Sequence, residues 1–385
     1  MVCASLRTWW GRFNTGRSFV LVVWAVMAMA FLLPATPPPL AANSSGAETP
    51  PSTSPVHQST TIPPADSSEF GVATTSGHPP YQDKTEPTLL QRHNLSVCWG
   101  ASSMHVQEAL LAAHSLREIR VAVVDTGVDT ASPLLSECVL EVVDIVDKSV
   151  VVDSCGHGTH IAGTIAAIAP NSEIIDVTVA DNRGHCTSSD VAKGIRAAVS
   201  SGAAVINLSL EVEPSPELEA AVQSAWQSGA ILIAAAGMPV PDSTTVSGSS
   251  TPAATPEGPC RPTMSPPVYP ASYPNVVAVT GTNEDHELAP VCNRGTWVDV
   301  AAPGLKTFSE MPGGTHGYMT GTSTAAAHVS GLAALLCGLA DDENRNGRVN
   351  DEVRLAIEAT SRPLGIEGTG NGIVDAEAAV RYIQR

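Results

Sequence analysis

Three side chains in this chain of 385 residues have the chemistry needed to attack a carbonyl carbon with a hydroxyl group. Asp125 directly follows an apolar run, His157 lies between two glycines before a helical pattern, and Ser323 opens another helical pattern. An imidazole oriented by a carboxylate can take the proton of a serine hydroxyl, which then becomes nucleophilic. Each signal alone is also typical of a cap or a turn. Their order along an α/β chain favours an Asp-His-Ser triad.

The elements that must position these residues are alternating strands and helices. Buried strands are predicted from unalternating apolar runs at 119–124, 173–179, 203–210, 230–235 and 276–280. Helices are predicted at 104–116, 161–169, 190–201 and 216–228. This alternation predicts a mostly parallel sheet with helices on both faces, in which ligands bind at the carboxyl ends of the strands.

Composition limits both the core and the partners. Hydrophobic residues make up 43% of the chain but aromatic residues only 4%, so Ala, Val, Ile and Leu must build the core. The formal net charge of -18 argues against nucleic acid and against an anionic membrane surface, because both attract clusters of Lys and Arg. We expect a monomer.

The N-terminal part is predicted to lie outside the folded domain. Residues 1–42 combine three arginines with an apolar run, which is typical of a cleaved signal peptide or of an uncleaved signal anchor. Both alternatives place the rest of the chain outside the cytoplasm, secreted or tethered to the outer face of the membrane by this segment. Residues 43–88 are rich in Pro, Ser and Thr and predict a disordered linker. Residues 89–385 form the predicted domain, with a loop insertion at 238–267.

The sequence around the three candidate residues resembles the subtilase family of serine proteases. The matching stretches are Val121 to Asp129, Gly156 to Gly163, Gly321 to Ser323 and His328 to Gly331. The resemblance implies a three-layer subtilisin-like α/β fold and hydrolysis of peptide bonds in a polypeptide substrate. Ser323 would be the nucleophile, His157 the general base, and Asp125 the residue that orients His157. No cofactor is required.

The resemblance also implies where substrate binds, as an extended strand. Ser209, Leu210 and Glu211 would lie on one side, with Ala235 and Gly237 at the specificity pocket, and the loop 181–186 on the other side. Glu211 stands where the family usually has Gly. Its carboxylate would either favour a basic substrate residue or face outward, and the sequence leaves both alternatives open.

The largest departure from the family pattern is Met238. The family has an Asn here, whose side chain donates a hydrogen bond to the oxyanion, whereas a thioether cannot donate one. Three hypotheses remain open. The chain is a slow protease, a protease with a substitute donor from the 238–267 loop, or a catalytically impaired pseudoprotease that binds peptides.

A second departure concerns metals. The loop insertion that carries calcium in many subtilisins is missing, so that site is predicted to be absent. Asp342, Asn344 and Asn346 resemble the start of a calcium loop, but Val353 stands where the bidentate acid is expected. The alternative is a polar connection to a helix that starts near Asn350.

Export favours disulfides, and the subtilase fold suggests pairings for loop cysteines. Cys155 and Cys186 would pair because their loops lie close together in that fold. Cys260 with Cys292 and Cys98 with Cys138 are weaker suggestions, and Cys337 is predicted to be a buried free thiol.

Overall fold

The computed structural model describes residues 99–146, 153–181, 183–239 and 264–385. The predicted targeting segment, the predicted linker and most of the predicted 238–267 loop lie outside these residues. Contacts divide the chain into Met1–Pro80 and Tyr81–Arg385, and every described residue belongs to the second unit. None of the helices in the described ranges combines the length and apolarity that crossing a bilayer demands.

A parallel sheet forms the middle of the described structure. Its strands are β1 (Ile119–Asp125), β2 (Val139–Asp144), β3 (Ser172–Thr178), β4 (Val205–Leu208), β5 (Ile231–Ala235), β6 (Val276–Thr282) and β7 (Val300–Pro303). The order across the sheet is β2-β3-β1-β4-β5-β6-β7, and all pairs are parallel. The five predicted strands are confirmed, whereas β2 and β7 at the two edges were not predicted.

Apolar cores lie on both faces of the sheet, which explains why its strands do not alternate with polar residues. Val121 and Val123 of β1 belong to one core cluster, while Ala122 and Val124 belong to the other. Aliphatic residues and alanine make up most of both clusters, as the composition predicts, and Tyr273 is the one aromatic residue among their buried members.

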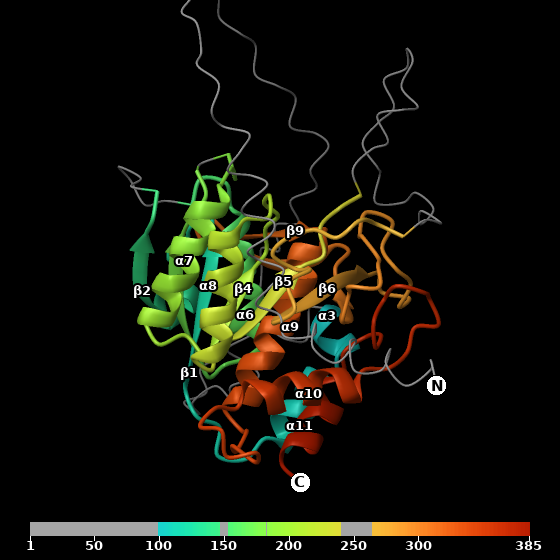
Figure 1. Ribbon diagram of the computed structural model, residues 1–385. Helices are drawn as coiled ribbons and strands as arrows, with labels where there is room; N and C mark the ends of the chain where they lie inside the picture. The colour runs from blue at the N-terminus through green and yellow to red at the C-terminus, as the bar shows by residue number, and fades with distance from the viewer. Residues whose placement is uncertain (1–98, 147–152, 182, 240–263) are drawn as a thin grey trace, which may run out of the picture. The chain divides into compact units, whose positions relative to one another are not determined.

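Helices cover both faces (Figure 1). The first face packs against α4 (Val106–Ala112), α6 (His157–Ile168), α9 (Thr322–Cys337), α10 (Asn350–Thr360) and α11 (Ala376–Ile383). The second face packs against α7 (Ser188–Ser200) and α8 (Pro216–Gln227), which lie side by side. Two short helices, α3 (Trp99–Ser103) and α5 (Pro133–Cys138), complete the set in the described ranges. The resulting three layers confirm the predicted α/β fold.

Close packing of α6 against α9 brings two of the candidate residues to the same edge of the sheet. Gly331 of α9 permits this approach, because a Cβ there would lie only 2.8 Å from the Cβ of Ile168.

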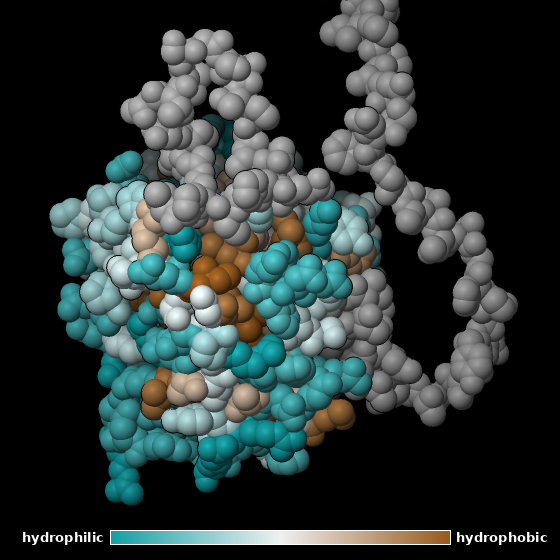
Figure 2. Space-filling view, turned by 90° about the vertical axis from the view of Figure 1, so that its right-hand side faces the viewer, coloured by the Kyte–Doolittle hydropathy of each residue, from teal (hydrophilic) through white to brown (hydrophobic). Residues whose placement is uncertain are grey.

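An antiparallel hairpin of β8 (Thr307–Met311) and β9 (Thr315–Met319) follows β7, and α6 packs against β8. One face of the molecule is mostly hydrophilic around a central hydrophobic patch (Figure 2).

Candidate active site

Asp125 and His157 form a hydrogen-bonded pair at the carboxyl edge of the sheet. Asp125 is the last residue of β1, and His157 is the first residue of α6. The Nδ1 atom of His157 lies 2.7 Å from Oδ1 of Asp125, whose side chain is only 3% exposed. Gly156, the N-cap of α6, has φ of 81°, a conformation that glycine adopts readily. This turn lets the imidazole reach the end of β1.

The buried carboxylate of Asp153 fixes the loop that carries His157. Its Oδ1 accepts hydrogen bonds from the Thr126 hydroxyl and the Gly156 N–H, both at 2.8 Å. Its Oδ2 accepts from the N–H of Thr159 at 2.9 Å and from the hydroxyl of that residue at 2.6 Å. One side chain therefore links the residue after Asp125 to the first turn of α6.

Replacing Asp153 by Ala should destabilise the protein strongly, because four buried donors would lose their acceptor. We expect the free energy of unfolding to fall by about 3 kcal/mol or more. Urea unfolding in a Ser323→Ala background measures this loss without self-digestion. The control is Asp285→Ala, which removes an exposed carboxylate. Equal unfolding midpoints for the two variants would contradict the structural role of Asp153.

Ser323 lies in the first turn of α9, at the same edge of the sheet. Its hydroxyl donates to the carbonyl oxygen of Ser209 at 3.2 Å, and the Ser209 hydroxyl donates to the carbonyl oxygen of Ser323 at 2.9 Å. Ser209 follows β4, which pairs with β1, the strand that ends at Asp125. The Ser323 hydroxyl is thus bonded to Ser209 rather than to His157. Catalytic hydrogen bonds are often completed only when substrate binds.

Burial and nearby carboxylates act in opposite directions on the pKa of His157. Burial lowers this pKa, whereas the charge of Asp125, its hydrogen bond and the charge of Asp153 raise it. The carboxylates outweigh burial, so the net pKa lies above the ordinary value of 6.5. The imidazolium form is therefore stabilised, as a general base that receives a proton requires.

The residues predicted to bind substrate lie at the ends of β4 and β5, which are parallel neighbours. Ser209, Leu210 and Glu211 follow β4, while Ala235 ends β5 and Gly237 follows it. The structure thus brings this set to the edge where Ser323 lies. The 181–186 loop follows β3, on the other side of β1, and its Asp181 accepts from the backbone N–H groups of Arg183 and His185.

Met238 follows Gly237 at the same edge and is 57% exposed. Gly237 has φ of 74°, so the chain turns sharply before the methionine. The thioether can accept a weak hydrogen bond but cannot donate one. Most of the loop that was considered as a source of a substitute donor lies outside the described residues.

The predicted disulfide between Cys155 and Cys186 is not formed, and both residues are free thiols. Their loops do lie close together, since a Cβ on Gly184 would be 4.0 Å from the sulfur of Cys155. Cys186, however, packs against the apolar cluster beneath α7, while Cys155 is exposed. The other two suggested pairs involve Cys98 and Cys260, which lie outside the described residues.

Cys337 is a buried free thiol, as predicted. It lies at the end of α9 and is only 3% exposed. Burial raises its pKa to about 12, so the thiol stays protonated and unreactive at neutral pH.

The residues considered for calcium form a loop that bonds to itself. Asp342 accepts from the backbone N–H groups of Asn346 and Gly347, and the side-chain amides of Asn344 and Asn346 donate to Asp351. These contacts fit a polar connection between α9 and α10, and α10 starts at Asn350 as predicted. Within the described ranges, no group of three or more His, Cys, Asp or Glu is placed to hold a metal ion.

Two acids near the candidate site were missed by sequence analysis. Asp153 is one, and Asp176 of β3 is the other. Burial raises the pKa of Asp176 to about 7, although it accepts hydrogen bonds from the Val128 N–H and the Thr178 hydroxyl. The sequence did contain a signal for Asp176, because a charged residue inside an otherwise apolar strand must find polar partners.

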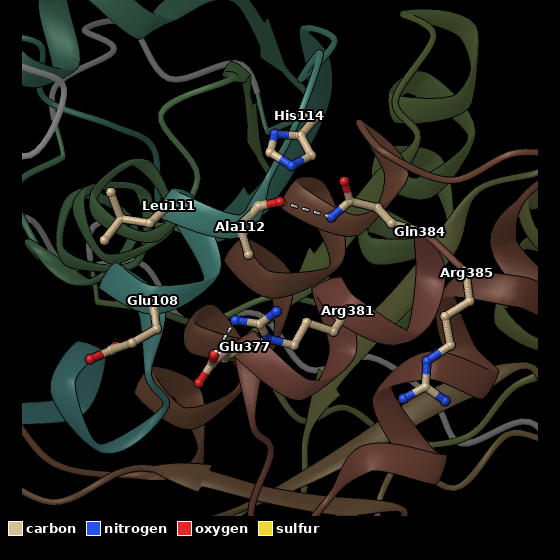
Figure 3. Close-up of a pocket in the computed structure, with 8 residues that line it drawn as sticks. All are labelled: Glu108, Leu111, Ala112, His114, Glu377, Arg381, Gln384 and Arg385. Atoms are coloured by element: carbon tan, nitrogen blue, oxygen red, sulfur yellow. Dashed lines mark hydrogen bonds and ion pairs between the residues drawn. The ribbon is translucent and has the colours of Figure 1, made fainter.

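A groove of about 740 Å³ lies between α4 and α11 and contains none of these residues (Figure 3). Glu377 and Arg381, which line it, form an ion pair at 2.8 Å. Gln384 donates to the carbonyl oxygen of Ala112 at 3.2 Å. Three of its polar side chains are therefore already bonded within the protein.

Known proteins share the sequence that builds this edge. The model of the subtilase family matches residues 117–374. A thermophilic serine proteinase of Bacillus sp. (strain AK1) is 40% identical over 278 residues, which make up 68% of this chain and 61% of that protein. Thermitase of Thermoactinomyces vulgaris is 36% identical over 277 residues, which make up 68% of this chain and 88% of thermitase.

Subtilisin Savinase of Lederbergia lenta is 33% identical over 297 residues, 74% of this chain and 99% of that protein. The chain thus spans less than two thirds of the Bacillus proteinase but nearly all of this subtilisin. The family match covers the region from β1 to the residues just before α11, including all three candidate residues. The chain therefore belongs to the subtilase family of serine endopeptidases.

Proposed function

We propose that this protein hydrolyses peptide bonds in polypeptides through a triad of Asp125, His157 and Ser323. The observation that carries the proposal is the hydrogen bond of 2.7 Å between His157 and Asp125, at the sheet edge where Ser323 opens α9. This arrangement provides an oriented base at the sheet edge that also carries the Ser323 hydroxyl. The similar proteins, which include a serine proteinase and a subtilisin, point to the same chemistry.

In this mechanism Ser323 attacks the carbonyl carbon of the scissile bond, and its proton moves to Nε2 of His157. The Asp125 carboxylate, bonded to Nδ1, orients the ring and stabilises the imidazolium. The imidazolium then gives the proton to the leaving amine, and water hydrolyses the acyl-enzyme by the same route. No step requires a cofactor.

In this proposal the attacked oxygen becomes negatively charged and accepts a hydrogen bond from the backbone N–H of Ser323, at the start of α9. The positive end of the helix dipole supports this donor. Met238 occupies the position from which the family's Asn would donate. We therefore propose a slow endopeptidase unless the loop after Met238 supplies a donor.

The proposal is tested by labelling the full-length protein with a fluorophosphonate, which reacts with activated serine hydroxyl groups. We expect one label, on Ser323, and none in a Ser323→Ala variant. Peptide mapping identifies the labelled residue. Absence of label on Ser323 under conditions that label a subtilisin would contradict the proposal.

Met238 also favours a second candidate function, a peptide-binding pseudoprotease. The substrate-binding residues at the ends of β4 and β5 would be retained, while the oxyanion would lack a side-chain donor. In that case peptides would bind with measurable affinity. They would not be cleaved, and they would not acylate Ser323. The fluorophosphonate experiment separates the two functions.

The pH dependence of activity should follow His157, since only its neutral form can accept a proton. Its raised pKa predicts that kcat/KM rises with pH through a midpoint above 6.5. An Asp125→Asn variant should move this midpoint to lower pH and lower kcat/KM about 10⁴-fold. Profiles of kcat/KM against pH for both proteins provide the measurement. A midpoint at or below 6.5 in the unaltered protein would contradict this assignment.

We further propose that the protein acts outside the cytoplasm as a monomer. The location outside the cytoplasm is supported by the sequence of residues 1–42, which is typical of a signal peptide or a signal anchor. Sequencing the N-terminus of the exported protein distinguishes cleavage from anchoring. The acidic surface gives no support for a nucleic-acid partner.

A further inference from the structure

The side chain of Glu211 lies against Gly237, at the sheet edge that carries the candidate active site. Leu210 and Val212, on either side of it, pack against the apolar cluster beneath α7 and α8. Because successive side chains of an extended chain point to opposite sides, Glu211 faces away from that cluster. Its carboxylate lies against Gly237, where a Cβ would be only 2.5 Å from Oε2 of Glu211. The glycine thus leaves the space that this carboxylate uses.

Glu211 is connected to the proposed nucleophile through Ser209. Ser209 exchanges two hydrogen bonds with Ser323, and Glu211 follows two residues later. Two residues of extended chain span about 7 Å, a distance that a long side chain can bridge. The side chain of a residue whose carbonyl carbon meets Ser323 can therefore reach the space beside Glu211 and Gly237.

Among the described residues, no Lys, Arg or His forms an ion pair or hydrogen bond with Glu211. Burial raises its pKa above the ordinary value, and the charge of Glu213 raises it further. The neighbouring amide of Asn293 donates to the carbonyl oxygen of Ala236 at 2.9 Å instead. Glu211 is exposed to solvent, so a cationic group of a ligand can reach its carboxylate and would stabilise its charged form.

We propose that Glu211 selects substrates with Lys or Arg immediately before the scissile bond. This inference rests on the proposed attack by Ser323 on a peptide carbonyl. The carboxylate would pair with the ammonium or guanidinium group, while the methylene stem would lie along the apolar residues at the ends of β4 and β5. Glu211 is thus a specificity-determining residue for the proposed reaction.

The test compares two peptide anilides that differ only in the residue before the anilide, Lys or the uncharged norleucine. We expect kcat/KM for the Lys peptide to exceed that for the norleucine peptide about tenfold or more. Glu211→Gln should bring the ratio close to one, and Glu211→Lys should invert it. The matched control Glu213→Gln removes a neighbouring charge and should leave the ratio unaltered. A ratio that Glu211→Gln does not change would overturn the proposal.

The same ratio can be obtained without turnover. In a Ser323→Ala background, competition binding of the corresponding peptide acids gives the ratio of their Kd values, with and without Glu211→Gln. A tenfold preference for Lys that depends on Glu211 supports the inference even if Ser323 proves unreactive, in which case only the proposed hydrolysis fails. Equal Kd values for the two peptides would reject the role of Glu211.

Discussion

Replacing Ser323 by Ala should lower kcat for peptide hydrolysis by about 10³- to 10⁴-fold. Removal of the triad serine costs about 10⁶ in kcat, a value that comes from a subtilisin. The missing side-chain donor at Met238 should already have lowered the starting rate by about 10² to 10³, again a subtilisin value, so less activity remains to be lost. The loss arises because neither His157 nor the helix terminus can replace the nucleophile.

The measurement is initial-rate hydrolysis of a chromogenic peptide by the purified full-length protein. Ser200→Ala is the matched control, because Ser200 is an exposed serine whose hydroxyl bonds only within its own helix. This control should keep the rate of the unaltered protein. A Ser323→Ala variant that hydrolyses the peptide at an unchanged rate would exclude Ser323 as the nucleophile.

Replacing Met238 by Asn should raise kcat by about 10² to 10³. The asparagine amide would supply a donor to the oxyanion that the thioether cannot supply. Because this donor acts on charge that develops in the transition state, KM should change much less than kcat.

Met238→Leu is the control for this experiment, since leucine has a similar volume and also lacks a donor. Its kcat should equal that of the unaltered protein. If neither variant changes kcat, the oxyanion already has a substitute donor, and the prediction for Met238→Asn is wrong. If Met238→Asn creates activity in a protein that had none, the unaltered chain is the pseudoprotease.

Buried strands were the most predictable part of the fold. β1, β3, β4, β5 and β6 are apolar on both faces, because helices cover both sides of the sheet, and such runs stand out in a sequence. The edge strand β2 escaped prediction because its residues are only partly buried and include Glu141 and Asp144. The β8–β9 hairpin escaped for a similar reason, since most residues of β9 are exposed or half-exposed.

Pairing of cysteines could not be predicted from proximity of loops. The loops of Cys155 and Cys186 are neighbours, yet the sulfur of Cys186 is used in apolar packing. Side-chain direction depends on which cavity offers the lower free energy, and this depends on residues distant in sequence. A resemblance between folds does not contain that information.

By itself, the sequence indicated which residues could do the proposed chemistry and that residue 238 has no side-chain donor. The types and order of Asp125, His157 and Ser323, and the thioether at Met238, are properties of the chain alone. Only the tertiary structure decided that Asp153 links β1 to α6 and that Glu211 lies against Gly237. The physical reason is that hydrogen bonds and desolvation depend on distances between groups that are far apart in the chain. These distances are fixed only when the sheet and its helices pack together.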